Sequence, residues 1–170
     1  DIDRITITSS GMNAIMLVSE LLIDAGDNMI VVGPVWPNCR ETVHVMGGAV
    51  HDVLLKPDET GRWRLDLDEL MAACDDRTRG VFVNSPGNPT GWVMQTDEQR
   101  ALMAFCRERG IYIVADEVYG RLAYDRDRAP SFIDVAGPED RLIVVNSFSK
   151  NWSMTGWRLG WLTHPVDLGE

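Results

Sequence analysis

Short runs of apolar residues alternate along this chain with longer segments in which apolar positions recur every three or four residues. Apolar runs that are rich in Val and Ile and bounded by Gly, Pro or Asp predict buried β-strands. These runs fall at residues 5–8, 29–32, 49–54, 80–84, 111–115, 142–145 and 157–162. Helical spacing predicts helices between most of them, at residues 14–25, 38–46, 66–73 and 96–109. The alternation predicts an α/β fold of three layers, with a mainly parallel seven-stranded sheet and helices on both faces.

Polar residues mark the ends of these elements. Asp66 and Thr96 are each placed to cap the helix that follows, and Gly110 ends the second of these helices. Residues 56–64 are predicted to form a polar turn, and the charged segment 124–140 is predicted to be a surface connection. The last strand follows its predecessor without room for a long helix, so an antiparallel direction is open for it.

The composition is that of an ordinary globular protein, with 45% hydrophobic and 25% charged residues. A chain of 170 residues without an internal repeat or linker is expected to form one domain. The net charge of -10 argues against nucleic-acid binding. No run reaches the length of a membrane span and no basic-then-apolar leader is recognisable, so a reducing cytoplasm is the default location.

The spacing of cysteine and histidine predicts neither a disulfide framework nor a metal site. Cys39, Cys74 and Cys106 are odd in number and widely separated, and the three histidines are equally scattered. None of the usual zinc-ligand spacings is present, so we predict no metal. The chain begins almost directly with a strand and stops soon after another, which leads us to expect part of a longer protein.

Two predicted strands end in residues that could carry chemistry. Lys150 comes shortly after the apolar run 142–145, so it is expected at the end of a buried strand. Burial lowers the pKa of an amine and favours its nucleophilic form, which makes Lys150 a candidate Schiff-base lysine. The alternative is an ordinary solvated lysine. Asp116 and Glu117 follow the strand 111–115, where carboxylates need a cationic partner unless they cap the next turn.

Other unusual features also fall at predicted strand ends. Ser10-Gly11 could offer backbone N–H groups to an anion, although any strand-to-helix turn needs small residues. Trp36 stands between two prolines, and Asn88 lies in a Ser-Pro-Gly-Asn-Pro-Thr-Gly segment that can form neither helix nor strand. Ligands bind where the carboxyl ends of parallel strands meet. Together these strand ends supply a set of groups that suits pyridoxal phosphate. The set consists of a lysine, an anion-binding turn with Arg158, a stacking aromatic residue, an amide, and an acid near Tyr119.

The motifs carry a specific resemblance. The segment 147–160, Ser-Phe-Ser-Lys-Asn-Trp-Ser-Met-Thr-Gly-Trp-Arg-Leu-Gly, resembles the cofactor-attachment signature of the class I/II aminotransferase family of fold type I pyridoxal-phosphate enzymes. Asn-Pro-Thr-Gly at 88–91 and Ala-Asp-Glu-Val-Tyr at 115–119 are similar to two further motifs of that family, in the same order. The resemblance reaches from Ser10 to Gly160 and implies the large, cofactor-binding domain of such an enzyme.

The resemblance implies a role for each matching residue. Lys150 would be the Schiff-base lysine and the proton shuttle at the α-carbon of the substrate. Asp116 would pair with the pyridine nitrogen and keep it protonated. Tyr119 and Asn88 would hydrogen-bond the phenolic oxygen, and Trp36 would stack on the ring.

The same resemblance implies a phosphate site and a particular backbone geometry. The phosphate would be held by Arg158, Ser147 and the N–H groups of Gly11 and Met12, with Ser149 as a further candidate. Cis peptide bonds are expected at Gly33-Pro34 and Asn88-Pro89.

Parts of the family's pattern have no counterpart in this chain. In the family, an arginine of a C-terminal small domain grips the substrate carboxylate, and an N-terminal segment helps to close the site. The partner subunit of a homodimer also contributes to the site. We therefore expect residues 1–170 to be the large domain without its substrate clamp, and to be inactive alone.

The motifs leave three functions open. The favoured one is transfer of an amino group between an amino acid and a 2-oxo acid. A C–S β-lyase or a decarboxylase could use the same scaffold, because the shared motifs build the cofactor site and do not choose the bond that is broken. The third is the aminotransferase-like sensing domain of a transcription regulator, whose DNA-binding part would be a separate domain.

Overall fold

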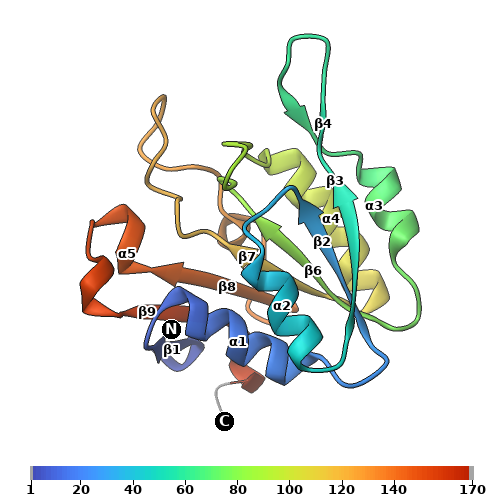
Figure 1. Cartoon of the computed structure of the whole chain (residues 1–170), viewed down its shortest axis with the longest axis horizontal. Helices are drawn as coiled ribbons and strands as arrows, with labels where there is room; N and C mark the ends of the chain where they lie inside the picture. Colours follow the sequence, from blue (N-terminus) through green and yellow to red (C-terminus); the bar gives the residue numbers. More distant parts are fainter. Residues whose placement is uncertain (1, 169–170) are drawn as a thin grey trace.

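A single seven-stranded sheet forms the centre of the computed structural model, which describes residues 2–168 (Figure 1). The strands lie in the order β1-β9-β8-β7-β6-β2-β3. Their bounds are β1 (Ile5–Thr8), β2 (Asn28–Gly33), β3 (Ala49–Leu54), β6 (Thr78–Asn84), β7 (Tyr112–Asp116), β8 (Leu142–Ser147) and β9 (Gly160–Thr163). The five strands β3, β2, β6, β7 and β8 are adjacent in the sheet and run parallel to one another. Strand β9 runs antiparallel to both of its neighbours, β8 and β1. The predicted sheet is confirmed, and so is the antiparallel last strand.

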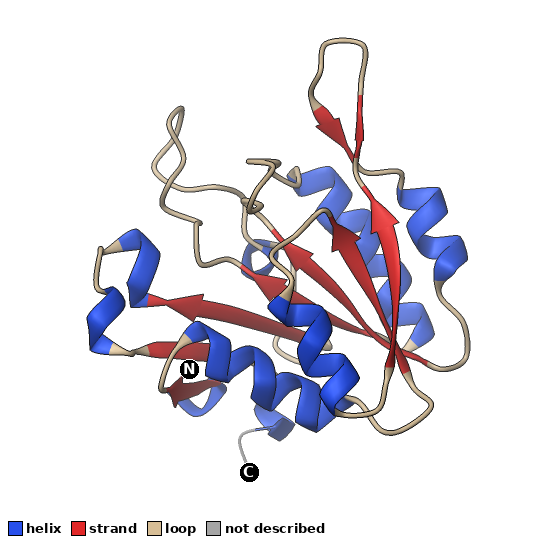
Figure 2. Ribbon diagram, in the orientation of Figure 1, coloured by secondary structure: helices blue, strands red, loops and turns tan. Residues whose placement is uncertain are grey.

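Helices cover both faces of the sheet (Figure 2). One face carries α1 (Gly11–Leu22) and α2 (Asn38–Val45), and the other carries α3 (Leu67–Ala73) and α4 (Thr96–Arg109). The short helix α5 (Phe148–Asn151) lies beyond the end of β8. This is the three-layer arrangement predicted from the alternation of strands and helices.

The central strands are apolar throughout because each face is buried against a different helix layer. In β2, Met29 and Val31 belong to the core cluster beneath α1 and α2. The alternate residues Ile30 and Val32 belong to the cluster beneath α3 and α4. Successive side chains of a strand point to opposite faces, so one continuous apolar run builds both cores.

The helix ends follow from capping. The structure starts α1 at Gly11, ahead of the predicted start at Ala14, because the Ser10 hydroxyl accepts a hydrogen bond from the Asn13 amide at 3.1 Å. The helix ends at Leu22, earlier than predicted, where Ile23 turns extended. Asp66 caps α3 as predicted, accepting from the Glu69 amide at 3.0 Å.

The predicted cap of α4 was wrong by one residue. Gln95 is the N-cap, and its backbone amide donates a hydrogen bond to the Glu98 carboxylate at 2.7 Å. Gly110 ends this helix as predicted, with a φ of 66° in the left-handed region that glycine adopts without strain.

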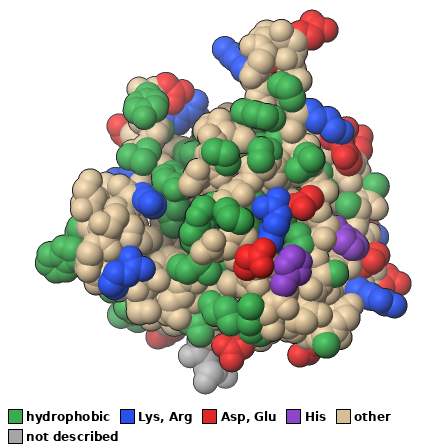
Figure 3. Space-filling view, viewed as in Figure 1, with side chains coloured by type: hydrophobic (Ala, Val, Ile, Leu, Met, Phe, Trp, Pro, Cys, Tyr) green, Lys and Arg blue, Asp and Glu red, His purple; other side chains and the backbone are tan. Residues whose placement is uncertain are grey.

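Two predicted connections contain more structure than the sequence indicated. Residues 56–64 include the hairpin β4 (Lys56–Pro57) and β5 (Trp63–Arg64), which projects from the body with charged side chains at its tip (Figures 1 and 3). Within 124–140, Phe132 is 1% exposed and belongs to the core, so the prediction of a surface connection was wrong there.

The last strand is shorter than predicted. It begins at Gly160 because Thr155–Trp157 form a turn of 3-10 helix and Arg158 adopts a left-handed conformation with φ of 49°. No helix within residues 2–168 has the length and apolar character needed to cross a membrane.

Candidate active site

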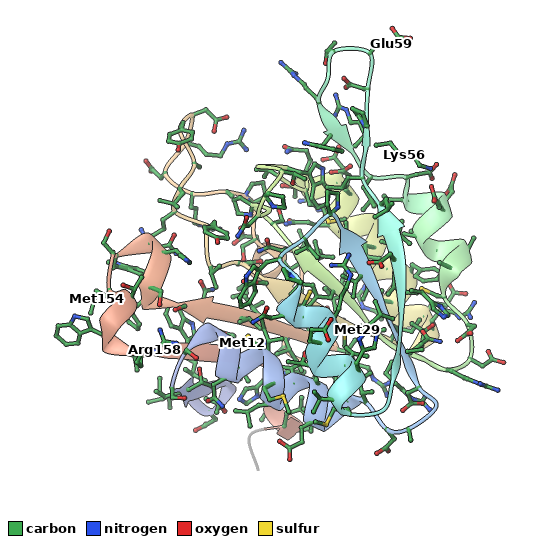
Figure 4. All side chains as sticks on the ribbon, viewed as in Figure 1. Met12, Met29, Lys56, Glu59, Met154 and Arg158 are labelled. Carbon is green, nitrogen blue, oxygen red and sulfur yellow. The ribbon has the colours of Figure 1, made fainter. Side chains whose placement is uncertain are left out.

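A cavity of about 260 Å³ opens at the carboxyl ends of β6, β7 and β8. The residues predicted to bind the cofactor all line it: Gly11, Met12, Trp36, Asn88, Asp116, Tyr119, Ser147, Ser149, Lys150 and Arg158. Met12, at the start of α1, and Arg158 lie at the same end of the sheet in Figure 4. The parallel topology thus brings together residues that lie far apart along the chain, from Ser10 to Arg158.

Asp116, the last residue of β7, is the buried acid of this cavity. Its side chain is 7% exposed and accepts a hydrogen bond from the Val118 amide at 3.2 Å. Burial raises the pKa of this carboxyl to about 7, against the smaller lowering effect of that hydrogen bond. Among residues 2–168, no Lys, Arg or His forms an ion pair with Asp116. The site therefore favours a ligand that brings a positive charge to this carboxyl.

Asn88 and Tyr119 form a polar pair beside this acid. The Asn88 side-chain amide donates to the Tyr119 hydroxyl at 3.2 Å, although the two residues belong to different loops. The loop of Asn88 has the predicted cis bond at Asn88-Pro89, and the other predicted cis bond, Gly33-Pro34, is also present. Ser85-Pro86 is cis as well, which the sequence did not indicate.

The N-terminus of α1 provides the anion cradle. Gly11 opens the helix, where unpaired backbone N–H groups and the helix dipole attract negative charge. Ser147 lies against it, because a Cβ added to Gly11 would come within 3.3 Å of the Ser147 Cβ. A Cβ at Gly160 would lie 2.7 Å from the Gly11 nitrogen, so only glycine at 160 leaves that amide uncovered.

Arg158 stands over this cradle in an unusual conformation. Its φ of 49° costs a non-glycine residue about 1–2 kcal/mol. The guanidinium donates to the Thr155 carbonyl at 2.9 Å, which helps to hold it in place. A strained backbone beside a ligand cavity is the pattern expected when the position of a side chain matters for binding.

Lys150 lies at the rim of the cavity, and the expectation that its side chain is buried was wrong. The residue is exposed, at the end of the single-turn helix α5. Its Nζ is 6.0 Å from the centre of the Tyr119 ring, on the cavity side. The strand β8 ends at Ser147, so Lys150 stands one helical turn beyond the close-packed part of the sheet.

Trp36 is also a rim residue, 41% exposed. Its backbone is better fixed than its ring, because its amide donates to the Asn88 carbonyl at 3.0 Å. The Cys39 thiol, in turn, donates to the Trp36 carbonyl at 3.3 Å. The indole is therefore available to cover a flat ligand in the cavity.

Glu117, the second carboxylate of the sequence pair, does not face the cavity. It accepts hydrogen bonds from the Ser131 hydroxyl at 2.6 Å and the Phe132 amide at 2.9 Å. Burial raises the pKa of this carboxyl to about 7, with both hydrogen bonds acting in the opposite direction. Glu117 thus anchors the segment that the sequence had indicated as a surface connection.

The cavity also contains residues that the sequence did not single out, chiefly Asn84 and Thr155. Asn84 ends the apolar run of β6 and looked like the last residue of a strand. A second, wider cavity of about 730 Å³ adjoins the first and shares Asn88 and Tyr119 with it.

Comparison with known proteins agrees with this geometry. The model of the family described as aminotransferase class I and II matches residues 2–167. An aspartate aminotransferase of Streptomyces avermitilis is 34% identical over 170 residues, which cover 99% of this chain and 41% of that protein. The human kynurenine–oxoglutarate transaminase 1 is 30% identical over 171 residues, covering 95% of this chain and 40% of that protein.

The fold is also similar to that of a solved aminotransferase structure. The crystal structure of an aspartate aminotransferase from Thermotoga maritima superposes with a TM-score of 0.92 at 33% identity, over 99% of this chain and 44% of that one. The chain therefore spans about two fifths of the length of the curated relatives that it matches.

Proposed function

Because this chain belongs to the aminotransferase class I and II family, we propose that it supplies the pyridoxal 5'-phosphate site of an amino-group-transferring enzyme. The enzyme would move an amino group between an amino acid and a 2-oxo acid. The relatives named as aminotransferases support this proposal. The observation that carries it is the gathering of Lys150, Asp116, the Asn88–Tyr119 pair and Arg158 around one cavity.

The residues of the cavity fit this cofactor at three separate points. The buried Asp116, without a cationic partner in residues 2–168, suits a protonated ring nitrogen. The N-terminus of α1 with Arg158 suits a phosphate, and Gly160 leaves the Gly11 amide uncovered for it. The Asn88–Tyr119 pair offers hydrogen bonds to a phenolic oxygen. When bound, pyridoxal phosphate supplies a ring that accepts electrons from the α-carbon of the substrate.

Asp116 would hold a proton on the ring nitrogen. Its pKa of about 7 reflects burial without a cation, and a positive charge beside it would lower that pKa again. The ionised carboxylate is then the stable form next to the ring. Tyr119 and Asn88 would orient the ring from the phenolic side, and Trp36 would cover one of its faces.

Lys150 would attach the cofactor through Nζ and then carry a proton to and from the substrate's α-carbon. Its position at the rim suits both tasks, because Nζ lies 6.0 Å from the centre of the Tyr119 ring, which also lines the cavity. Arg158, Ser147 and the amides of Gly11 and Met12 would hold the phosphate and fix the ring relative to Lys150.

The remaining parts of the enzyme are proposed from the length of its relatives. We expect residues 1–170 to be the large domain of a longer protein that also has an N-terminal segment and a C-terminal small domain. That protein is expected to be a cytoplasmic homodimer, and the isolated chain to be inactive. The free thiols of Cys39, Cys74 and Cys106 are consistent with a reducing compartment.

The test is an amino-group exchange assay on the full-length protein, loaded with pyridoxal phosphate and given amino acids together with 2-oxo acids. Appearance of the new amino acid in step with the new 2-oxo acid is the expected result. Release of ammonia and pyruvate instead would indicate a β-lyase, and release of carbon dioxide a decarboxylase. Cofactor binding without turnover of any substrate would favour a sensing domain.

A further inference from the structure

One buried amide side chain connects several walls of the candidate site. Asn84, the last residue of β6, is 5% exposed. Its Nδ2 donates to the backbone carbonyl of Asp116 at 3.0 Å, and its Oδ1 accepts from the backbone amide of Asn88 at 2.8 Å. The end of β7 and the loop that carries Asn88 are therefore held by the same side chain.

The partners of Asn84 fix the orientation of its amide. A backbone N–H can only donate and a backbone C=O can only accept, so one orientation of the Asn84 amide satisfies both. An aspartate has the same shape, but its ionised form has no donor for the Asp116 carbonyl. An aliphatic residue would have neither group and would leave the Asn88 amide without its partner.

The contacts continue from Asn88 to the other side chains of the cavity. The Asn88 carbonyl accepts from the Trp36 amide at 3.0 Å. The Asn88 side chain donates to the Tyr119 hydroxyl at 3.2 Å. A displacement of Asn84 would thus reach the acid, the amide–phenol pair and the aromatic residue together.

We infer that Asn84 is a positioning residue, which sets Asp116 and Asn88 at the mutual spacing that the bound ring requires. This inference rests on the proposed cofactor site. Asn84 acts through its two backbone contacts, so its loss is expected to weaken cofactor binding and to change the environment of the ring. A residue that only stabilises the fold would change neither.

The test compares Asn84→Asp with a matched control, Asn28→Asp, in the full-length protein. Asn28 is also buried, 3% exposed, and its amide also bridges two partners, Asp75 and Thr78, both at 2.8 Å. It lies at the start of β2, at the opposite end of the strands from the cavity. Both variants place a carboxyl in a buried bridging position, so both should lower the melting temperature.

Only Asn84→Asp is expected to affect the cofactor. The dissociation constant of pyridoxal phosphate should rise roughly tenfold or more, as for a lost hydrogen bond that orients the ligand. The pH midpoint of the bound cofactor's visible absorbance should also move. Equal cofactor affinity and equal pH midpoint in Asn84→Asp, Asn28→Asp and the parent protein would overturn the inference.

A double-mutant cycle with Asn88→Ala tests whether Asn84 acts through Asn88. The variant for this cycle is Asn84→Ala, which removes the acceptor of the Asn88 amide. Its effect on the dissociation constant should be at least several-fold smaller when Asn88 is already alanine. Full additivity would contradict the positioning role. If Asn84→Asp does not fold, Asn84→Ala takes its place in the comparison with Asn28 as well. A parent protein that does not bind pyridoxal phosphate would instead contradict the proposed function itself.

Discussion

The floor and the rim of the candidate site are built differently. The floor consists of Asp116, Asn84 and Asn88, which come directly from strand ends or are bonded to them. The rim consists of Lys150, Arg158 and Trp36, which are exposed and stand on a single-turn helix or in loops. Packing of the sheet thus places the floor before any ligand arrives, whereas the rim residues stand outside that packing.

This difference predicts that rim substitutions change function without changing stability. Floor substitutions should change both, because their side chains are buried and hydrogen-bonded. The predictions that follow test this contrast, starting with the largest expected effect.

Lys150→Ala tests the rim. Amino-group exchange by the full-length protein should fall by about 10³-fold or more, since both attachment and proton transfer are lost. The free energy of unfolding should stay within about 0.5 kcal/mol of the parent value, because the side chain is exposed. Lys56→Ala, at an exposed lysine on the hairpin that pairs with Glu69, is the control and should keep full activity. Substantial activity in Lys150→Ala would remove this lysine from the chemistry.

Asp116→Asn tests the floor. Exchange activity should fall by roughly 10²-fold, because an amide cannot hold the ring nitrogen in its protonated form as a carboxylate does.

The stability of the ligand-free parent protein should also change with pH because of Asp116. The folded-state pKa of about 7 lies above the ordinary 3.8, so the contribution of Asp116 to stability is complete below pH 3.8 and declines as pH rises toward 7.

The asparagine variant lacks this titration. Urea unfolding between pH 4 and pH 8, at a fixed salt concentration and without cofactor, should therefore show a shallower fall in stability for Asp116→Asn than for the parent. An identical pH dependence in both proteins would contradict the burial of this carboxyl.

Glu117 tests a buried residue that is next to the floor in the chain but does not face the cavity. Glu117→Ala leaves the buried Phe132 amide and Ser131 hydroxyl without their partner and should cost about 2 kcal/mol of unfolding free energy. Glu117→Gln can still accept from the Phe132 amide while its NH₂ group donates to Ser131, so it should cost much less. Cofactor affinity should change little in Glu117→Gln. Equal destabilisation in urea by both variants would contradict the anchoring role.

Trp36→Ala has the smallest expected effect. Loss of a stacking contact of about 1 kcal/mol corresponds to roughly a fivefold rise in the dissociation constant of pyridoxal phosphate. Trp36→Phe should keep most of the affinity, because a smaller ring can still cover the ligand. The measurement is a cofactor titration followed by absorbance. An unchanged affinity in Trp36→Ala would place this side chain away from the ring.

The place of Asp116 at a strand end in the floor could be predicted from the sequence, and there is a physical reason for this. Buried parallel strands are recognisable from their apolar runs, and parallel topology forces their carboxyl ends together. Asn88 and Tyr119 were likewise expected in one site, and their side chains do meet.

Other features could not be predicted from patterns along the chain. The exposure of Lys150 depends on where β8 stops and how short α5 is, which apolar spacing does not fix. Asn84 resembles any polar residue at a strand end, and its contacts are with backbone groups far along the chain. Phe132 follows the charged run 125–128, and that run does not indicate that Glu117 anchors the Phe132 amide in the interior.

The most direct test of Lys150 as the attachment point of the cofactor uses the fact that residues 1–170 contain two lysines, Lys56 and Lys150. The full-length protein is incubated with pyridoxal phosphate, the attachment is made irreversible with borohydride, and labelled peptides are identified by mass. We expect a label on the peptide that contains Lys150 and none on Lys56. The Lys150 label should be reduced in Arg158→Ala, because the phosphate is held less tightly. A label on Lys56 alone, or equal labelling of both lysines, would contradict the proposal that Lys150 attaches the cofactor.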